Sequence, residues 1–213
     1  MMADISFLTT LGKTDEQIEA EADRRPPRLY LGMSEIGDEC TRRLWLKFHT
    51  DFKETFTARQ LRIYDTGHII EARIVRDLRH AGYRVNRSAR SNSFSDFDGR
   101  FKGHSDGIIS GVEESDRRHI LEIKSANDKR FKKIKEEGIS AEPKYRAQIQ
   151  MYMGYAHLDR ALFVVENKNT SERISERISF NRDEFFRLRE KTRLLLQAKE
   201  PPSGLHENPS WYL

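Results

Sequence analysis

Two segments of the sequence carry charged residues at the alternate positions expected of neighbouring β-strands. Side chains alternate across a strand, so Glu122 and Lys124 share one face while the apolar residues beside them can enter the core. In the preceding segment, His104 and Asp106 share a face in the same way. A turn at residues 111–117 would fold the first segment back against the second. We therefore expect Asp106 to lie beside Glu122.

Asp106, Glu122 and Lys124 together have the composition of a hydrolytic metal site. Two adjacent carboxylates repel each other, so unless one binds a proton they need a cation, and oxygen ligands favour Mg²⁺ or Mn²⁺. A metal ion between them could bind a phosphodiester oxygen and lower the pKa of a bound water. Lys124 could orient that water or offset charge on the pentacovalent phosphate. Taken without Asp106, Glu122 and Lys124 would more simply form a surface ion pair.

A long segment of helical periodicity before these strands supplies two further candidates. Glu71 lies next to an apolar stripe that includes Ile70 and Ile74, where an isolated carboxylate would be costly without a partner. We expect Glu71 to be a third metal ligand. His68 lies three residues earlier on the same helix face and could bind a metal, contact phosphate or simply pack.

The helical pattern of residues 143–157 places polar and aromatic side chains on one face: Tyr145, Gln148, Tyr152 and Tyr155. If this face points outward, the aromatic rings suit stacking on bases and the amide suits hydrogen bonding to phosphate. Ordinary half-buried packing explains the same pattern equally well.

Basic residues gather on another predicted helix, nearer the N-terminus. Arg42, Arg43 and Lys47 could form a basic path toward the site, or they could be a solvated helix face. The whole chain is only mildly basic, with 38 Lys and Arg against 34 Asp and Glu and a formal charge of +4. This balance permits a nucleic-acid partner without requiring one.

Hydrophobic periodicity predicts the elements that must position these residues. Helical patterns cover residues 14–23, 34–49, 58–81, 129–137, 143–157 and 182–199. Strand patterns cover residues 83–87, 91–97, 100–110, 118–125, 161–166 and 173–180. We expect the first four strands to form an antiparallel meander. The order of elements predicts an α+β (α/β) fold in which helices flank a central mixed β-sheet.

With 213 residues, 37% of them hydrophobic, the chain can form one domain with a core. We expect an N-terminal helical extension and linker at 1–28, a body at 29–200 and a tail at 201–213. The single cysteine, Cys40, excludes an internal disulfide and a four-thiolate site, and a small buried thiol is its simplest interpretation. No segment approaches the roughly 18 apolar residues of a membrane span, so we expect a cytoplasmic protein without a membrane partner.

Four motifs follow one another along the chain: Gly67-His68-Ile69-Ile70-Glu71, Gly103-His104-Ser105-Asp106-Gly107, Glu122-Ile123-Lys124, and Gln148 with Tyr152. In this order and spacing they resemble the RecB-type branch of the PD-(D/E)XK nucleases, including phage recombination exonucleases. Ser105 stands where many members have proline. The resemblance extends over roughly residues 30–180 and implies a restriction-endonuclease-like core.

This resemblance also implies roles for individual residues. The implied metal ligands are three side chains and one backbone carbonyl, those of Glu71, Asp106, Glu122 and Ile123, with Mg²⁺ or Mn²⁺ as the cofactor. Lys124 is implied to be catalytic with Asp106 and Glu122, while Gln148 and Tyr152 would support the site or contact DNA. Cys40 resembles the first cysteine of relatives that bind an iron–sulfur cluster with three more near the C-terminus. Those three are absent, so no cluster is expected, whether the chain is a cluster-free variant or a shortened form.

The function implied is metal-dependent DNA exonuclease activity on DNA ends, in recombination, repair or end processing in a bacterial or phage-infected cell. A structure-specific or nicking endonuclease of the same fold is the alternative. An inactive DNA-binding subunit is less consistent with the retained Asp106, Glu122 and Lys124. DNA is the expected partner, and a homo-oligomer or a recombination or helicase partner is compatible with this interpretation.

Overall fold

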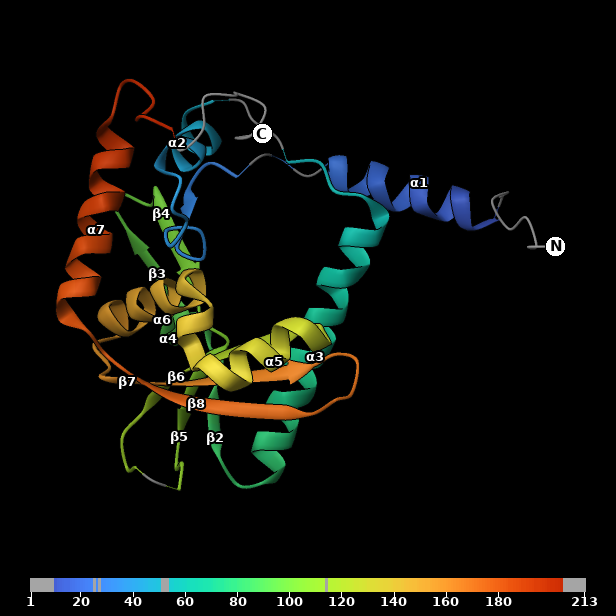
Figure 1. The fold of residues 1–213 in the computed structure, drawn as a ribbon, viewed down its shortest axis with the longest axis vertical. Coiled ribbons are helices and arrows are strands. Elements are labelled where there is room, and N and C mark those ends of the chain that lie inside the picture. Colours follow the sequence, from blue (N-terminus) through green and yellow to red (C-terminus); the bar gives the residue numbers. More distant parts are fainter. Residues whose placement is uncertain (1–9, 25, 27, 51–53, 114, 205–213) are drawn as a thin grey trace.

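The computed structural model describes residues 10–24, 26, 28–50, 54–113 and 115–204, and Figure 1 shows a layered α+β body with one helix projecting from it. The helices are α1 (Thr10–Asp23), α2 (Thr41–His49), α3 (Ala58–His80), α4 (Ala89–Asn92), α5 (Asp128–Glu137), α6 (Pro143–Ala156) and α7 (Arg182–Gln197). The strands are β1 (Leu31–Gly32), β2 (Arg84–Asn86), β3 (Ser93–Asp96), β4 (Phe101–His104), β5 (Gly107–Ser110), β6 (His119–Ala126), β7 (Arg160–Asn167) and β8 (Arg173–Ser179). A 3-10 turn, Gly138–Ala141, joins α5 to α6.

A five-stranded sheet of order β2-β5-β6-β7-β8 runs through the body. Strands β6 and β7 are parallel, and the other three pairs are antiparallel. Helix α3 packs on one face, where Ile70 contributes to a cluster with Leu121 of β6. Helices α5 and α6 pack on the other face, where Phe131 and Ile149 belong to a second cluster with Ile120. The prediction of a central mixed sheet flanked by helices is therefore confirmed.

The segment at residues 100–110 is not one strand, so the predicted four-stranded meander is wrong. Strand β4 joins β1 and β3 in a separate three-stranded sheet, whereas β5 joins the five-stranded sheet. The chain changes sheet at Gly107, whose φ of 155° favours glycine and where an added Cβ would lie 2.9 Å from the last carbonyl of β2. His104 ends β4 and shares a hydrogen bond with Ser93, so it does not share a strand face with Asp106.

The helix predicted at residues 34–49 begins only at Thr41, because the residues before it form turns. Cys40 caps the helix, and its Sγ accepts a hydrogen bond from the Arg43 backbone N–H at 3.4 Å. The thiol is buried, in agreement with its simplest interpretation from the sequence.

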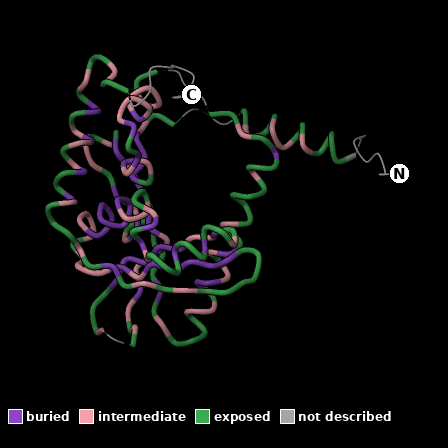
Figure 2. The backbone as a smooth tube through the Cα atoms, in the orientation of Figure 1, coloured by how far each residue is buried: buried purple, intermediate pink, exposed green. Residues whose placement is uncertain are grey.

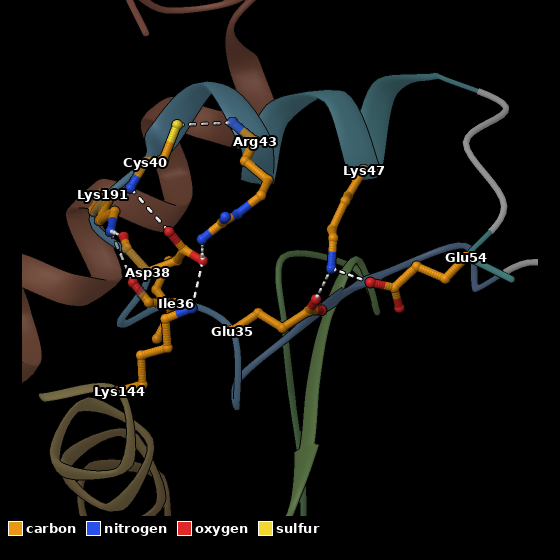
Figure 3. A network of polar contacts seen from close by, with 9 residues as sticks. All are labelled: Glu35, Ile36, Asp38, Cys40, Arg43, Lys47, Glu54, Lys144 and Lys191. Atoms are coloured by element: carbon orange, nitrogen blue, oxygen red, sulfur yellow. Dashed lines mark hydrogen bonds and ion pairs between the residues drawn. The ribbon is translucent and has the colours of Figure 1, made fainter. Parts of the chain in front are cut away.

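Asp38 holds these turns against the rest of the body, as Figure 3 shows. Its carboxylate accepts hydrogen bonds from Lys144 at 2.6 Å and from the Cys40 N–H at 2.9 Å, and it pairs with Arg43. Lys191 of α7 donates to the Asp38 carbonyl at 2.6 Å. Burial raises the pKa of Asp38, but the hydrogen bonds from Lys144, Arg43 and Cys40 outweigh it and hold that pKa below its usual value.

Helix α1 lies against the first turns of α3. The Asp15 carboxylate pairs with Arg62 at 2.5 Å, and Glu19 accepts a hydrogen bond from the Ala58 N–H at 2.7 Å. Figure 2 shows that the rest of α1 is largely exposed. Among the described residues, every helix is too short or too polar to cross a lipid bilayer.

Candidate active site

The acidic residues converge where β6 extends beyond its neighbour. Strand β5 pairs with β6 only as far as Leu121, so the second half of β6 has an open edge on that side. There the Ile123 N–H donates to Asp106 Oδ2 at 2.6 Å. The N–H and C=O of one strand residue point to the same side, so the Ile123 carbonyl also faces this edge. Asp106 therefore takes the place of the missing strand partner.

Glu122 and Lys124 lie next to this edge, on one face of β6 as the alternation predicts. The Glu122 side chain is 1% exposed, and its Oε1 accepts a hydrogen bond from Lys124 Nζ at 2.5 Å. Its other oxygen, Oε2, is buried without a hydrogen-bond partner among the described residues. A buried carboxylate oxygen without a donor raises the free energy of the folded state, so a cation there would be stabilising.

The three charged groups shift one another's pKa values. The pKa of Glu122 is raised to about 8, and burial is the largest cause. The charge of Lys124 acts to lower this pKa, and the charge of Asp106 acts to raise it. Burial also raises the pKa of Asp106 above its usual value, against the attraction of Lys124. Burial alone would lower the pKa of Lys124, but the carboxylates of Glu122 and Asp106 raise it. Near pH 7 the carboxylate pair therefore retains a proton unless a further cation replaces it.

Helix α3 brings Glu71 and His68 into the same region. Burial and the charge of Asp106 raise the pKa of Glu71. The Glu71 carboxylate is paired with Arg87, which follows β2. Arg87 carries no motif in the sequence, and its only signal there is its place directly after a strand next to the predicted site strands.

The donor atoms at the β6 edge suit a hard divalent cation. Among the described residues, no three His, Cys, Asp or Glu side chains are arranged as a complete metal site. Asp106 and Glu122 nevertheless supply two carboxylates, one with an unpartnered oxygen, and Ile123 supplies a carbonyl. An all-oxygen set of this kind favours Mg²⁺ or Mn²⁺. Glu71 is the candidate for a third carboxylate, and its Oε1 pairs with Arg87.

A cleft of about 1200 Å³ opens above this edge, and residues of α1, α3 and α5 contribute to its lining. Its lining includes Asp106, Lys124, Glu71 and His68. Besides Lys124, the Lys and Arg residues that line it are Arg28, Lys47, Arg62, Arg130 and Lys168, and the aromatic residues are Tyr30, Phe48, Phe56, Tyr64 and Tyr145. Within the part of the chain that the structure describes, four of these five cations, all but Lys168, pair with acidic residues of the protein, as Arg62 does with Asp15. Cations and aromatic faces together suit a nucleic-acid strand.

Tyr145 is the member of the predicted polar aromatic face that lies in the cleft. Its ring centroid is 5.0 Å from Lys124 Nζ and 4.8 Å from the Arg130 guanidinium carbon. Arg130 is itself held by two hydrogen bonds of 2.5 Å to Glu142. This arrangement restrains the position of the lysine ammonium group.

Gln148 and Tyr152 are buried, so the outward-facing alternative is wrong for these two residues. Their exposed fractions are 5% and 2%, and Gln148 Nε2 donates to the Tyr152 hydroxyl at 2.9 Å. An added Cβ at Gly103 would lie 2.7 Å from the Tyr152 ring, which shows how closely β4 covers it. Burial and the nearby charge of Glu122 raise the pKa of Tyr152. Contact with DNA bases is excluded in this arrangement, whereas a supporting role remains a prediction.

Arg42 and Arg43 are not brought to the cleft. Arg42 Nη1 donates to the Pro202 carbonyl at 3.1 Å, and Arg43 pairs with Asp38. Of the three basic residues predicted as a path, Lys47 lines the cleft. The helix starts later than predicted, and the turn before it supplies the acidic partner that turns Arg43 away.

Comparison with known families places the motifs in one domain. Residues 67–159 match the family model described as a YqaJ-like viral recombinase domain. The matched range contains Glu71, Asp106, Glu122, Lys124 and Gln148. This match confirms the resemblance to the PD-(D/E)XK nucleases. A sequence search of curated proteins found no match.

Solved structures resemble most of the body. The alkaline exonuclease LHK-Exo from Laribacter hongkongensis matches with a TM-score of 0.58 and 16% identity, over 85% of this chain and 90% of that one. LHK-Exo in complex with dAMP gives a TM-score of 0.59 and 17% identity over the same shares. A structure described as SSO0001 gives a TM-score of 0.51 and 16% identity, over 91% of this chain and 90% of that one. At such identities the likeness establishes a shared fold.

Proposed function

We propose that this chain, whose residues 67–159 match a YqaJ-like viral recombinase domain, is a Mg²⁺- or Mn²⁺-dependent DNA exonuclease. It would hydrolyse phosphodiester bonds from DNA ends in recombination, repair or end processing. The observation that carries the proposal is the convergence of Asp106, Glu122 and Lys124 at the open edge of β6, below a large cleft. The fold shared with an alkaline exonuclease supports an exonuclease over an endonuclease.

Four oxygen-bearing groups would hold the divalent ion: the carboxylates of Asp106, Glu122 and Glu71, and the Ile123 carbonyl. When bound, the ion supplies Lewis-acid activation of the phosphate and lowers the pKa of a water ligand. The chain prepares part of this arrangement in advance, because the Ile123 N–H already orients Asp106. Glu122 Oε2 has no competing donor among the described residues.

Lys124 would act on the reacting phosphate. The two carboxylates beside it raise its pKa, so it stays protonated through the neutral range. Its ammonium group contacts Glu122, and the side chain is 23% exposed and lines the cleft. It can therefore donate a hydrogen bond to a phosphate oxygen or to the attacking water, and it offsets charge that develops in the transition state.

The cleft would hold the DNA strand that leads to the site. Arg130 and Lys168 offer charges for phosphates near Lys124, and Tyr145 offers a ring face next to them. Tyr64, which is 51% exposed, offers a second ring on the α3 wall of the same cleft.

Digestion of end-labelled linear DNA tests this function. Labels at the 5′ or the 3′ end, in Mg²⁺, Mn²⁺ or chelator, should give metal-dependent release of nucleotides from one end, with covalently closed circles left intact. Cleavage of the circles would replace the proposal by an endonuclease. Intact linear DNA under every metal condition would overturn hydrolysis itself.

A further inference from the structure

A fully buried carboxylate ties the α3 helix to the sheet. Glu166 of β7 is 0% exposed, pairs with Arg73 of α3, and accepts a hydrogen bond from Arg173 Nε of β8 at 2.7 Å. Arg173 Nη1 in turn donates to Asp77 of α3 at 2.8 Å. We call these four residues the Glu166 cluster. It joins three elements through charge-assisted hydrogen bonds, which are among the stronger polar contacts in proteins.

The Glu166 cluster lies one strand away from the catalytic strand. In the parallel pairing of β6 with β7, Glu166 is opposite Ser125, and the preceding residue, Val165, is opposite Lys124. The part of the sheet that anchors α3 is therefore the part that carries the site. A change in the packing of α3 on β7 therefore moves α3 relative to Glu122 and Lys124.

The α3 residues of the cluster lie at one edge of the apolar stripe of α3, whereas the candidate ligand Glu71 lies within the stripe. Successive helical residues are rotated by about 100°, so Arg73 and Asp77 flank buried Ile70 on one side, whereas Glu71 lies between buried Ile74 and Val75. The apolar contacts determine how closely the helix packs on the sheet, but they restrain its rotation about its own axis less strongly. Polar contacts at the edge of the stripe restrain that rotation.

This rotation matters because Glu71 and Asp106 repel each other. Both are carboxylates in one cleft, and among the described residues they do not yet form part of a complete three-ligand site. Their repulsion favours a rotation of α3 that separates them. The ion pair between Glu71 Oε1 and Arg87 compensates part of this repulsion.

We propose that Glu166 is a positioning residue for the metal site, because by holding Arg73 it fixes the rotation of α3 that presents Glu71 to Asp106. This inference rests on the proposed function, since it concerns the affinity of the site for its metal. Nothing in the motifs identifies Glu166; the assignment follows from its burial and its two arginine partners.

Mn²⁺ binding without DNA, followed by electron paramagnetic resonance, tests the inference independently of activity. Glu166→Gln should weaken Mn²⁺ binding about ten-fold, as is typical when a residue that orients a metal ligand is changed. Arg73→Gln should weaken it similarly, and the double variant no more than either alone, because both changes remove one restraint. Arg73 is 39% exposed, so its variant tests the inference even if Glu166→Gln fails to fold.

Asp96→Asn is the matched control. Asp96 accepts hydrogen bonds of 2.7 Å from Arg189 and from Tyr155, away from α3, so its loss should lower the thermal stability while leaving Mn²⁺ binding unchanged. Hydrogen exchange should show lower protection of α3 amides in the Glu166 and Arg73 variants but not in the control.

Wild-type Mn²⁺ affinity in Arg73→Gln and in any folded Glu166→Gln would overturn the inference and leave a purely structural role. If the wild-type protein cleaves DNA, that result leaves the proposed function standing. A wild-type protein that neither binds Mn²⁺ nor cleaves DNA would overturn the proposed function and the inference together.

Discussion

In the proposed metal site, Glu122 would have to lose a proton before it binds the ion, so the metal affinity should depend on pH. Burial raises its pKa to about 8. At that pKa about 1% of the molecules carry ionised Glu122 at pH 6, about 9% at pH 7 and about 90% at pH 9. Mn²⁺ affinity should therefore rise about 90-fold from pH 6 to pH 9, with most of the increase below pH 8. The raised pKa of Asp106 adds to the effect in the same direction.

Calorimetric titration with Mn²⁺ in the absence of DNA measures both the affinity and the protons released. In paired buffers of different ionisation enthalpy, about 0.9 proton should leave Glu122 per bound ion at pH 7 and about 0.1 at pH 9. Glu122→Gln removes the titrating group, so its weaker binding should lose this part of the pH dependence. An Mn²⁺ affinity that is constant from pH 6 to pH 9, without proton release at pH 7, would show that the ionisation of Glu122 does not control metal binding.

Three further predictions concern packing, acid stability and DNA contact. Gly103→Ala should lower the free energy of unfolding by about 1–3 kcal/mol in urea titrations, because its Cβ would lie 2.7 Å from the Tyr152 ring; unchanged stability would contradict that contact. Asp38→Asn should lower the free energy of unfolding by about 3 kcal/mol near neutral pH. The pKa of Asp38 is depressed below 3.8, so its contribution is complete above that pH and is lost as the pH falls through the folded-state value. A gap between wild type and variant that does not shrink in acid would exclude this account. Lys168→Glu in the cleft should weaken DNA binding and reduce the salt slope by about 1 or more in filter-binding titrations, whereas Lys133→Glu outside the cleft should change both much less; equal effects would remove Lys168 from the DNA path.

The meeting of Asp106, Glu122 and Lys124 at one edge could be predicted because it depends on local rules. Glu122 and Lys124 share a strand face by simple alternation, and Asp106 reaches them because β5 pairs with β6 as the turn implied. The long helix before them was equally predictable from the spacing of Ile70 and Ile74. These features need no knowledge of distant parts of the chain.

The sheet change at Gly107, the inward orientation of Tyr152 and the pairing of Arg87 could not be predicted. They depend on tertiary contacts, which the spacing of residue types along the sequence does not reveal. Gly107 moves the chain from one sheet to the other, so His104 and Asp106 separate although they are two residues apart. Tyr152 faces inward because Gly103 makes room for its ring. Arg87 pairs with Glu71 across elements that periodicity cannot place relative to each other. In each case the contacting residue lies far along the chain or in a turn. The alternation of residue types does not predict which way a side chain points there.

Single-turnover cleavage of end-labelled DNA by Lys124→Ala is the sharpest test of the proposal that Lys124 acts with Asp106 and Glu122 on a phosphodiester bond. Loss of one preorganised electrostatic contact to the transition state should reduce the rate by about 10²–10³-fold. DNA binding in Ca²⁺ should stay close to wild type, and Lys133→Ala on the exposed face of α5 should keep the wild-type rate. A Lys124→Ala protein that binds and cleaves DNA at the wild-type rate would contradict the account.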